Sequence, residues 1–159
     1  MEVPEVSRQW LSTAFPNLPK VKWYKETTSG KESYEAKFKR NKKRYSVEFD
    51  TNGAVEDVER LTKWRALSNE VQSSLGSTFD EMERFKLIKI QEQWTAATPR
   101  LLSEAILNND RAAITLRFEV VFKANIEGEQ AIWEGLFDAN GQMLSKRKVI
   151  LRPTDNLDL

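Results

Sequence analysis

Two neighbouring segments near the N-terminus alternate strictly between apolar and polar residues, one over 31–40 and the other over 43–50. Their apolar members are Tyr34, Ala36, Phe38, Tyr45, Val47 and Phe49. A period of two is typical of antiparallel strands that bury one face and leave the other in water. The residues between and after these segments, Arg40-Asn41-Lys42 and Asp50-Thr51-Asn52-Gly53, favour tight hairpin turns.

Helical spacing precedes this alternating region. Val6, Trp10 and Ala14 recur four positions apart, which predicts an amphipathic helix that Pro16 and Pro19 terminate. We expect further strands over 20–26 and 55–61, which complete a four-stranded meander.

The same order of elements then begins again. Ser68 is placed to cap a short helix that ends near Gly76, and a strand follows over 83–94. Thr98-Pro99 opens another helix. Its predicted buried residues are Leu101, Leu102, Ala105 and Ile106, and strands are expected over 113–124, 129–138 and 143–151.

Comparison of the chain with itself explains this recurrence. Tyr34-Glu35-Ala36-Lys37-Phe38 returns as Phe118-Glu119-Val120-Val121-Phe122, and Phe49-Asp50-Thr51-Asn52-Gly53 returns as Phe137-Asp138-Ala139-Asn140-Gly141. We therefore predict an α+β fold of two α-β4 repeats, 3–62 and 66–152, within a single domain, 1–159. The repeats form one antiparallel sheet of about eight strands with the helices on one face, and an extra helix is inserted at about 91–110.

Composition removes several classes of function. The chain has 159 residues, no Cys, no His and a net charge of +1. Disulfides, thiolate or imidazole chemistry and zinc–thiolate sites are excluded, and the charge balance gives no case for nucleic-acid binding. No run approaches the ~20 apolar residues of a membrane span. The first residues lack the pattern of a signal peptide, which leaves a cytoplasmic protein or an exported chain without its leader as readings.

The repeated motifs also resemble a known family. Phe15-Pro16, Val21-Lys22-Trp23, Tyr34-Glu35-Ala36 and the Phe-Asp-x-Asn-Gly hairpin are similar to those of PepSY-like proteins, whose folds resemble beta-lactamase inhibitory protein. The resemblance implies a periplasmic or secreted protein of Bacteroidetes type, with a binding or inhibitory role. The chain differs from that pattern in having no visible leader and in its inserted helix.

The second repeat contains the sharpest candidate for a binding surface. Strand parity turns Val121, Ile132 and Leu136 toward the solvent side, beside Glu119 and Glu134. The first repeat has polar residues at the matching positions. An apolar patch with a charged rim indicates a protein partner or a homodimer contact. The alternative is that the inserted helix covers the patch.

Other candidates are weaker. Trp64 and Trp94 stand at predicted element ends, where they could contribute to the rim of a contact surface. The two Asp-x-Asn-Gly sequences could supply oxygen ligands to calcium, but a tight turn explains both copies. The basic segment 37–44 is interpreted as a solvated hairpin. Glu35 and Glu119 occupy equivalent positions in the two repeats.

These observations favour a non-catalytic binding or inhibitory module of the cell envelope, which would bind a protein partner through the solvent-facing side of its sheet. No catalytic residue, cofactor or metal site is predicted. Two alternatives stay open: a small-molecule carrier or enzyme with a carboxylate-lined pocket, and a self-associating structural protein.

Overall fold

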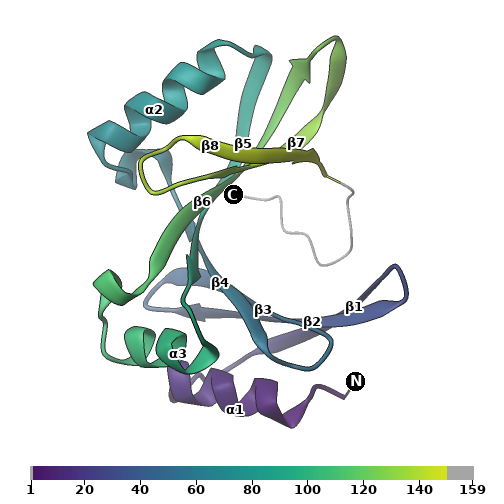
Figure 1. The fold of residues 1–159 in the computed structure, drawn as a ribbon, viewed down its shortest axis with the longest axis vertical. Coiled ribbons are helices and arrows are strands. Elements are labelled where there is room, and N and C mark those ends of the chain that lie inside the picture. The colour runs from purple at the N-terminus through teal and green to yellow at the C-terminus, as the bar shows by residue number, and fades with distance from the viewer. Residues whose placement is uncertain (1, 150–159) are drawn as a thin grey trace. The chain divides into compact units, whose positions relative to one another are not determined.

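The computed structural model describes residues 2–149, and it contains three α-helices and eight strands within them (Figure 1). The helices are α1 (Glu5–Ala14), α2 (Asn69–Asp80) and α3 (Pro99–Leu107). The strands are β1 (Lys22–Thr28), β2 (Lys31–Arg40), β3 (Lys43–Phe49), β4 (Val55–Thr62), β5 (Glu83–Thr95), β6 (Thr115–Ile126), β7 (Glu129–Phe137) and β8 (Met143–Lys148). The predicted α+β class with an eight-stranded antiparallel sheet is confirmed, and the strands follow one another in chain order.

The residues group into two compact units. The first unit comprises the chain up to Arg60 together with Gln93–Thr115, and the second comprises Leu61–Glu92 together with the chain from Leu116 onward. The segment 93–115, which contains α3, therefore belongs to the first unit although it follows the start of the second.

Strand parity is as predicted in both units. In β2 and β3 the residues that face the helix are buried, and Ala36, Val47 and Phe49 are completely inaccessible to solvent. Phe15, just after α1, contacts the rings of Phe38 and Tyr45 edge to face, with centroids 4.9 and 5.3 Å away. Alternation is a reliable signal here because only one face of these strands packs against a helix.

The buried face of α1 differs from the prediction by one position. Val6 is 51% exposed, whereas Ser7, Leu11 and Ala14 are buried. The polar Ser7 can be buried because its hydroxyl donates a hydrogen bond of 2.7 Å to the carbonyl of Gly53. A buried hydroxyl with a partner avoids the desolvation cost that would otherwise turn this face outward.

Each Asp-x-Asn-Gly sequence forms the predicted turn. Asp50 Oδ1 accepts hydrogen bonds of 2.9 Å from the amides of Asn52 and Ala54, and Asp138 Oδ1 accepts the equivalent pair in the second unit. Gly53 and Gly141 have φ of +84° and +87°, where a side chain is strained. The Asp Oδ1 atoms thus accept hydrogen bonds from the backbone amides of the turns. The turn interpretation of both sequences is confirmed.

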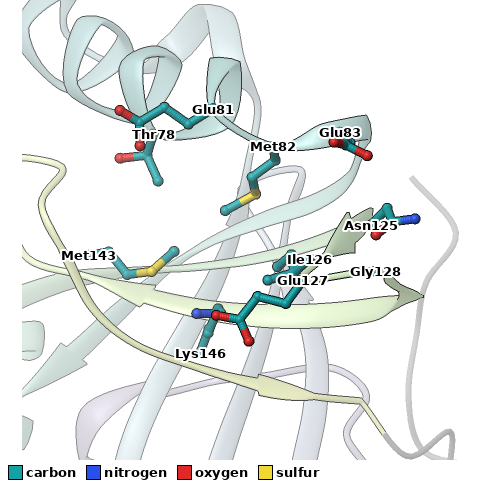
Figure 2. A pocket seen from close by; sticks show the side chains of 10 residues that line it. All are labelled: Thr78, Glu81, Met82, Glu83, Asn125, Ile126, Glu127, Gly128, Met143 and Lys146. Carbon is teal, nitrogen blue, oxygen red and sulfur yellow. The ribbon is translucent and has the colours of Figure 1, made fainter.

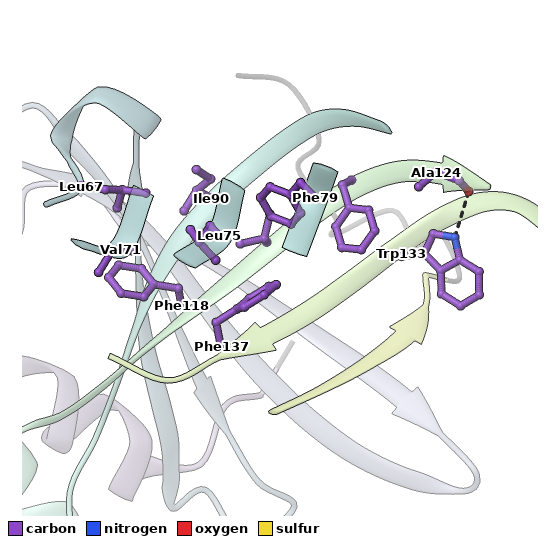
Figure 3. Close-up of a cluster of buried hydrophobic side chains, with 11 residues drawn as sticks. Leu67, Val71, Leu75, Phe79, Ile90, Phe118, Ala124, Trp133 and Phe137 are labelled. Carbon is purple, nitrogen blue, oxygen red and sulfur yellow. Dashed lines mark hydrogen bonds between the residues drawn. The ribbon is translucent and has the colours of Figure 1, made fainter. Parts of the chain in front are cut away.

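A cluster of aromatic and aliphatic side chains forms the core of the second unit (Figure 3). Phe79, on α2, contacts Phe122 and Phe137 with ring centroids 5.7 and 5.9 Å away. Trp133 closes one end of the cluster, where its Nε1 donates a 3.1 Å hydrogen bond to the carbonyl of Ala124. Trp133 is 8% exposed, so it belongs to the buried face of β7.

Two helix predictions need correction. Ser68 caps α2 as expected, by accepting a hydrogen bond from the amide of Val71, but the helix continues through Gly76 to Asp80. Phe79 in that last turn packs into the core, and this burial outweighs the modest helix preference lost at Gly76. In α3, Leu101 is 48% exposed, so the buried stripe is Leu102, Ser103, Ala105 and Ile106. Of the last predicted strand, residues 150 and 151 lie outside the described part of the chain.

Candidate binding face

Helices cover one face of the strands in each unit, and the opposite face, called the open face below, is the candidate binding surface. Its members are the strand residues that alternate with the buried set. In the first unit they include Glu35, Lys37, Ser46, Glu48 and Glu59, and in the second they include Glu119, Val121, Ile132, Glu134 and Leu136.

The open face of the first unit gathers three carboxylates. Strand register sets Glu35 opposite Glu48, and Ser46 opposite Glu59. As a result, one carboxylate oxygen from each of the three Glu residues lies within 4.8 Å of the others, and Glu59 is only 5% exposed. The Ser46 hydroxyl donates a hydrogen bond of 2.5 Å to Glu35 Oε2.

These three carboxylates create a local concentration of negative charge. Lys37 Nζ lies 3.8 Å from Glu35 Oε1 and 5.7 Å from the ring centroid of Tyr24, so one cation already balances part of that charge. Glu35, Glu48 and Glu59 are the residues here that could offer oxygens to a metal ion. Calcium usually takes six to eight oxygen ligands, so three carboxylates would supply only part of such a site.

The open face of the second unit is less polar. Ile132 and Leu136 are half-buried and stand on either side of Glu134 along β7. Arg147, from β8, donates hydrogen bonds of 2.9 and 3.2 Å from Nη2 and Nε to Glu134 Oε1. This ion pair fixes the orientation of the Glu134 carboxylate between the two apolar residues.

Burial raises the pKa of Glu134 above its ordinary value, and the nearby Glu119 carboxylate raises it further. Arg147 and Lys89 act in the opposite direction but do not cancel the effect of burial. The raised pKa of Glu134 means that this part of the open face is partly shielded from water.

The structure brings most of the predicted contact residues together. Glu119, Ile132, Glu134 and Leu136 share the open face of the second unit. Val121 shares that face too, but it is only 3% exposed, so the expectation that it is accessible is wrong. Val121 is short, lies on a strand between two others, and pairs with Glu134, so longer neighbours shield it.

The two tryptophans do not belong to this face. Trp94 is 6% exposed, and it packs edge to face on Tyr45 with the guanidinium of Arg60 5.0 Å from its ring centroid. Trp64 is half-buried and packs against Phe79, 6.4 Å away between centroids. Both side chains thus join the helix-side cores, and Trp94 is a core residue rather than a surface contact.

The inserted helix has its own partner. α3 packs beside α1 in the first unit, and the indole Nε1 of Trp10 donates a 2.8 Å hydrogen bond to the carbonyl of Pro99 at its start. The apolar stripe of α3 is therefore buried within the first unit, against α1, and not on the apolar patch of the second repeat that the sequence alternative assigned to it.

Sequence reasoning singled out Glu35 but missed Glu48 and Glu59. The signal was present, because a hairpin centred on residues 41 and 42 places 35 opposite 48. The bulge between Glu48 and Phe49 then sets the register of β4, and a bulge of this kind is hard to locate from sequence.

No protein-family model matches the sequence, and no curated protein matches it significantly. Solved bacterial structures, however, share its fold. A DUF2874 family protein of Bacteroides ovatus aligns with a TM-score of 0.62 and 13% identity over 93% of this chain and 89% of its own. A BLIP-like protein of Bacteroides fragilis aligns with a TM-score of 0.61 and 14% identity over 98% and 93%. A “putative periplasmic” protein of Bacteroides eggerthii aligns with a TM-score of 0.63 and 11% identity over 93% and 90%.

At these identities the likeness establishes the fold alone. The predicted resemblance to the BLIP-like fold is confirmed at that level. Among the described residues, no helix is long and apolar enough to cross a lipid bilayer.

Proposed function

We propose that this chain is a non-catalytic binding module of the bacterial cell envelope, and that it binds a protein partner through the open face. One observation carries the proposal. In the second unit, the half-buried Ile132 and Leu136 flank an oriented Glu134–Arg147 ion pair on the face opposite the helix. An apolar centre bordered by charged groups is the usual composition of a protein interface.

The location in the envelope has separate support. The structural neighbours come from Bacteroides species, and one of them carries a name that refers to the periplasm. The absence of Cys and His from the chain fits a protein that acts by presenting a surface rather than by catalysis.

The open face can be tested by changing its apolar residues to charged ones. The double variant Ile132→Asp/Leu136→Asp and the wild-type chain are immobilised and exposed to a Bacteroides envelope extract, and the retained proteins are identified by mass spectrometry. Leu107→Asp is the matched control, because Leu107 is 51% exposed on α3 and is not a residue of the open face. Circular dichroism confirms that all three chains are folded.

We expect a specific protein to be retained by the wild type and by Leu107→Asp and to be lost from the double variant, since interface hot spots each contribute about 2 kcal/mol or more. Retention of the same proteins by all three chains refutes the proposal. The patch also suits a homodimer, the second candidate. Analytical ultracentrifugation of the purified chain distinguishes the two, because a dimer that the double variant dissociates assigns the face to self-association.

A further inference from the structure

A cavity of about 420 Å³ lies on the helix side of the second unit (Figure 2). It is lined by the end of α2, the start of β5, the β6–β7 turn and β8. Met143 and Lys146 reach it from β8, and their partners in the register are Phe137 and Gly135, which are buried residues of β7. The cavity is therefore on the opposite side of the strands from Ile132 and Leu136.

The floor of the cavity is apolar. Met82, Ile126 and Met143 line it, and all three also pack against the aromatic core of the second unit. A floor that continues into a packed core is held in place. The volume of the cavity is within the range of small-molecule sites. Flexible thioether side chains adapt to an apolar group of varied shape.

The rim of the cavity is acidic. Glu81, Glu83 and Glu127 border it, with Lys146 as the one basic lining residue, and all four are exposed. None of the three carboxylates has an ion pair within the described part of the chain. The excess of negative charge favours a cation over an anion at this position.

The end of α2 adds to the same preference. The C-terminal end of this twelve-residue helix points toward the cavity, where Thr78 and Glu81 lie. The last turn of the helix contains no basic residue. The helix dipole places partial negative charge at that end, and here no side chain of the last turn neutralises it.

We propose that this cavity binds a small organic cation: an ammonium or guanidinium group at the acidic rim, attached to an apolar body that rests on Met82, Ile126 and Met143. Neither the apolar floor nor the acidic rim alone defines this class of ligand. The combination excludes carboxylates by charge, and it disfavours strongly hydrated inorganic cations because the floor offers them no ligands.

The experiment uses phenethylamine as the cationic probe, phenethyl alcohol as the neutral probe and phenylacetate as the anionic probe. Binding is followed by NMR through the ¹³C-labelled methyl groups of Met82 and Met143, which line the floor. Met82→Leu and Met143→Leu variants assign the two signals. We expect both signals to shift with phenethylamine, to shift less with the alcohol, and not to respond to phenylacetate.

Three variants test the charges. Glu81→Gln/Glu127→Gln is expected to weaken phenethylamine binding by about three- to ten-fold, the range that two exposed charges give. Lys146→Gln is expected to strengthen it by about two-fold, because a like charge is removed. Glu56→Gln, at an exposed site on β4 of the first unit, is expected to change nothing.

Several results would overturn the inference. Equal binding of phenethylamine and phenethyl alcohol would eliminate the role of the rim, and unchanged methionine signals at millimolar amine would eliminate the site. Weakening by Lys146→Gln would contradict the assigned sign of its effect. None of these outcomes bears on the open face, so this inference and the proposed function stand or fall separately.

Discussion

The close approach of α1 and of α2 to a hairpin turn gives the sharpest stability prediction. A Cβ atom added at Gly53 would lie 2.7 Å from Pro4 Cβ, 2.8 Å from Val6 Cγ1 and 2.9 Å from Ser7 Oγ. At Gly141 it would lie 2.8 Å from Ser74 Cβ. Contacts this short force a neighbour to move, so alanine at either position separates a helix from its turn.

Matched controls exist in the same chain. Gly30 and Gly128 also occupy turns with positive φ, +78° and +83°, but nothing lies within 4 Å of an added Cβ at either site. Alanine there pays only for the left-handed backbone, about 1–2 kcal/mol. Alanine at Gly53 or Gly141 destabilises the fold by the same amount and in addition overpacks the contact, which typically adds about 1–3 kcal/mol.

The two repeats should differ in the extra cost. At Gly53 the three nearest atoms belong to side chains, whereas at Gly141 they include a backbone atom, the Val71 carbonyl oxygen, 3.1 Å from the added Cβ. A carbonyl in the first turn of α2 can move only with the helix backbone. We therefore expect Gly141→Ala to destabilise at least as much as Gly53→Ala, and both to destabilise by more than the controls.

Thermal and urea unfolding measure these differences. For a chain of this size, about 2–4 °C of melting temperature corresponds to 1 kcal/mol. We expect Gly141→Ala to melt several degrees below Gly128→Ala. Equal melting temperatures for all four alanine variants would show that the short contacts relax without cost, and the reasoning would then be wrong.

Three further predictions concern the units, the open face and α3. The fragment 1–62, a complete sequence repeat, is expected not to fold alone, because its compact unit also requires 93–115; a poorly dispersed amide NMR spectrum would show this. Because the pKa of Glu134 is raised by folding, the folded state binds a proton more tightly than the unfolded state. The free energy of unfolding should therefore decrease as pH rises through the interval between the unfolded and folded pKa values, and Glu134→Gln should reduce that slope in urea titrations. Trp10→Phe removes the 2.8 Å hydrogen bond to the Pro99 carbonyl and should cost about 0.5–1.5 kcal/mol in urea unfolding.

Each of these has a clear contrary result. A well-dispersed spectrum from the fragment would mean that the contacts of α3 and Trp94 are dispensable. If the free energy of unfolding of Glu134→Gln has the same pH dependence as that of the wild type, this carboxyl group does not contribute to it. A Trp10→Phe variant as stable as the wild type would show that the Pro99 carbonyl finds another donor.

Much of the fold could be predicted because local signals and tertiary packing agree. The alternation around Val47 and Val120 is visible in the sequence and is used as predicted, since one face of each strand is buried. The turns at Gly53 and Gly141 are also local signals, because glycine adopts their positive φ without the strain that a side chain causes.

Predictions failed where burial depends on partners distant in the chain. Ser7 replaces Val6 on the buried face of α1 because its hydroxyl donates a hydrogen bond to the carbonyl of Gly53, 46 residues away. Trp94, at the end of β5, is buried because Tyr45 and Arg60 meet its ring. Neither contact leaves a mark on the local sequence pattern.

The amino-acid sequence by itself therefore determined the class of fold, the order of the strands and the residues that share each face, since these follow from periodicity and turn chemistry. Only the tertiary structure decided where α3 packs, that Glu48 and Glu59 join Glu35, and that a cavity forms between α2 and the β6–β7 turn. Such features depend on register and on which surfaces meet, and both are set by the packing of the whole chain rather than by any local segment.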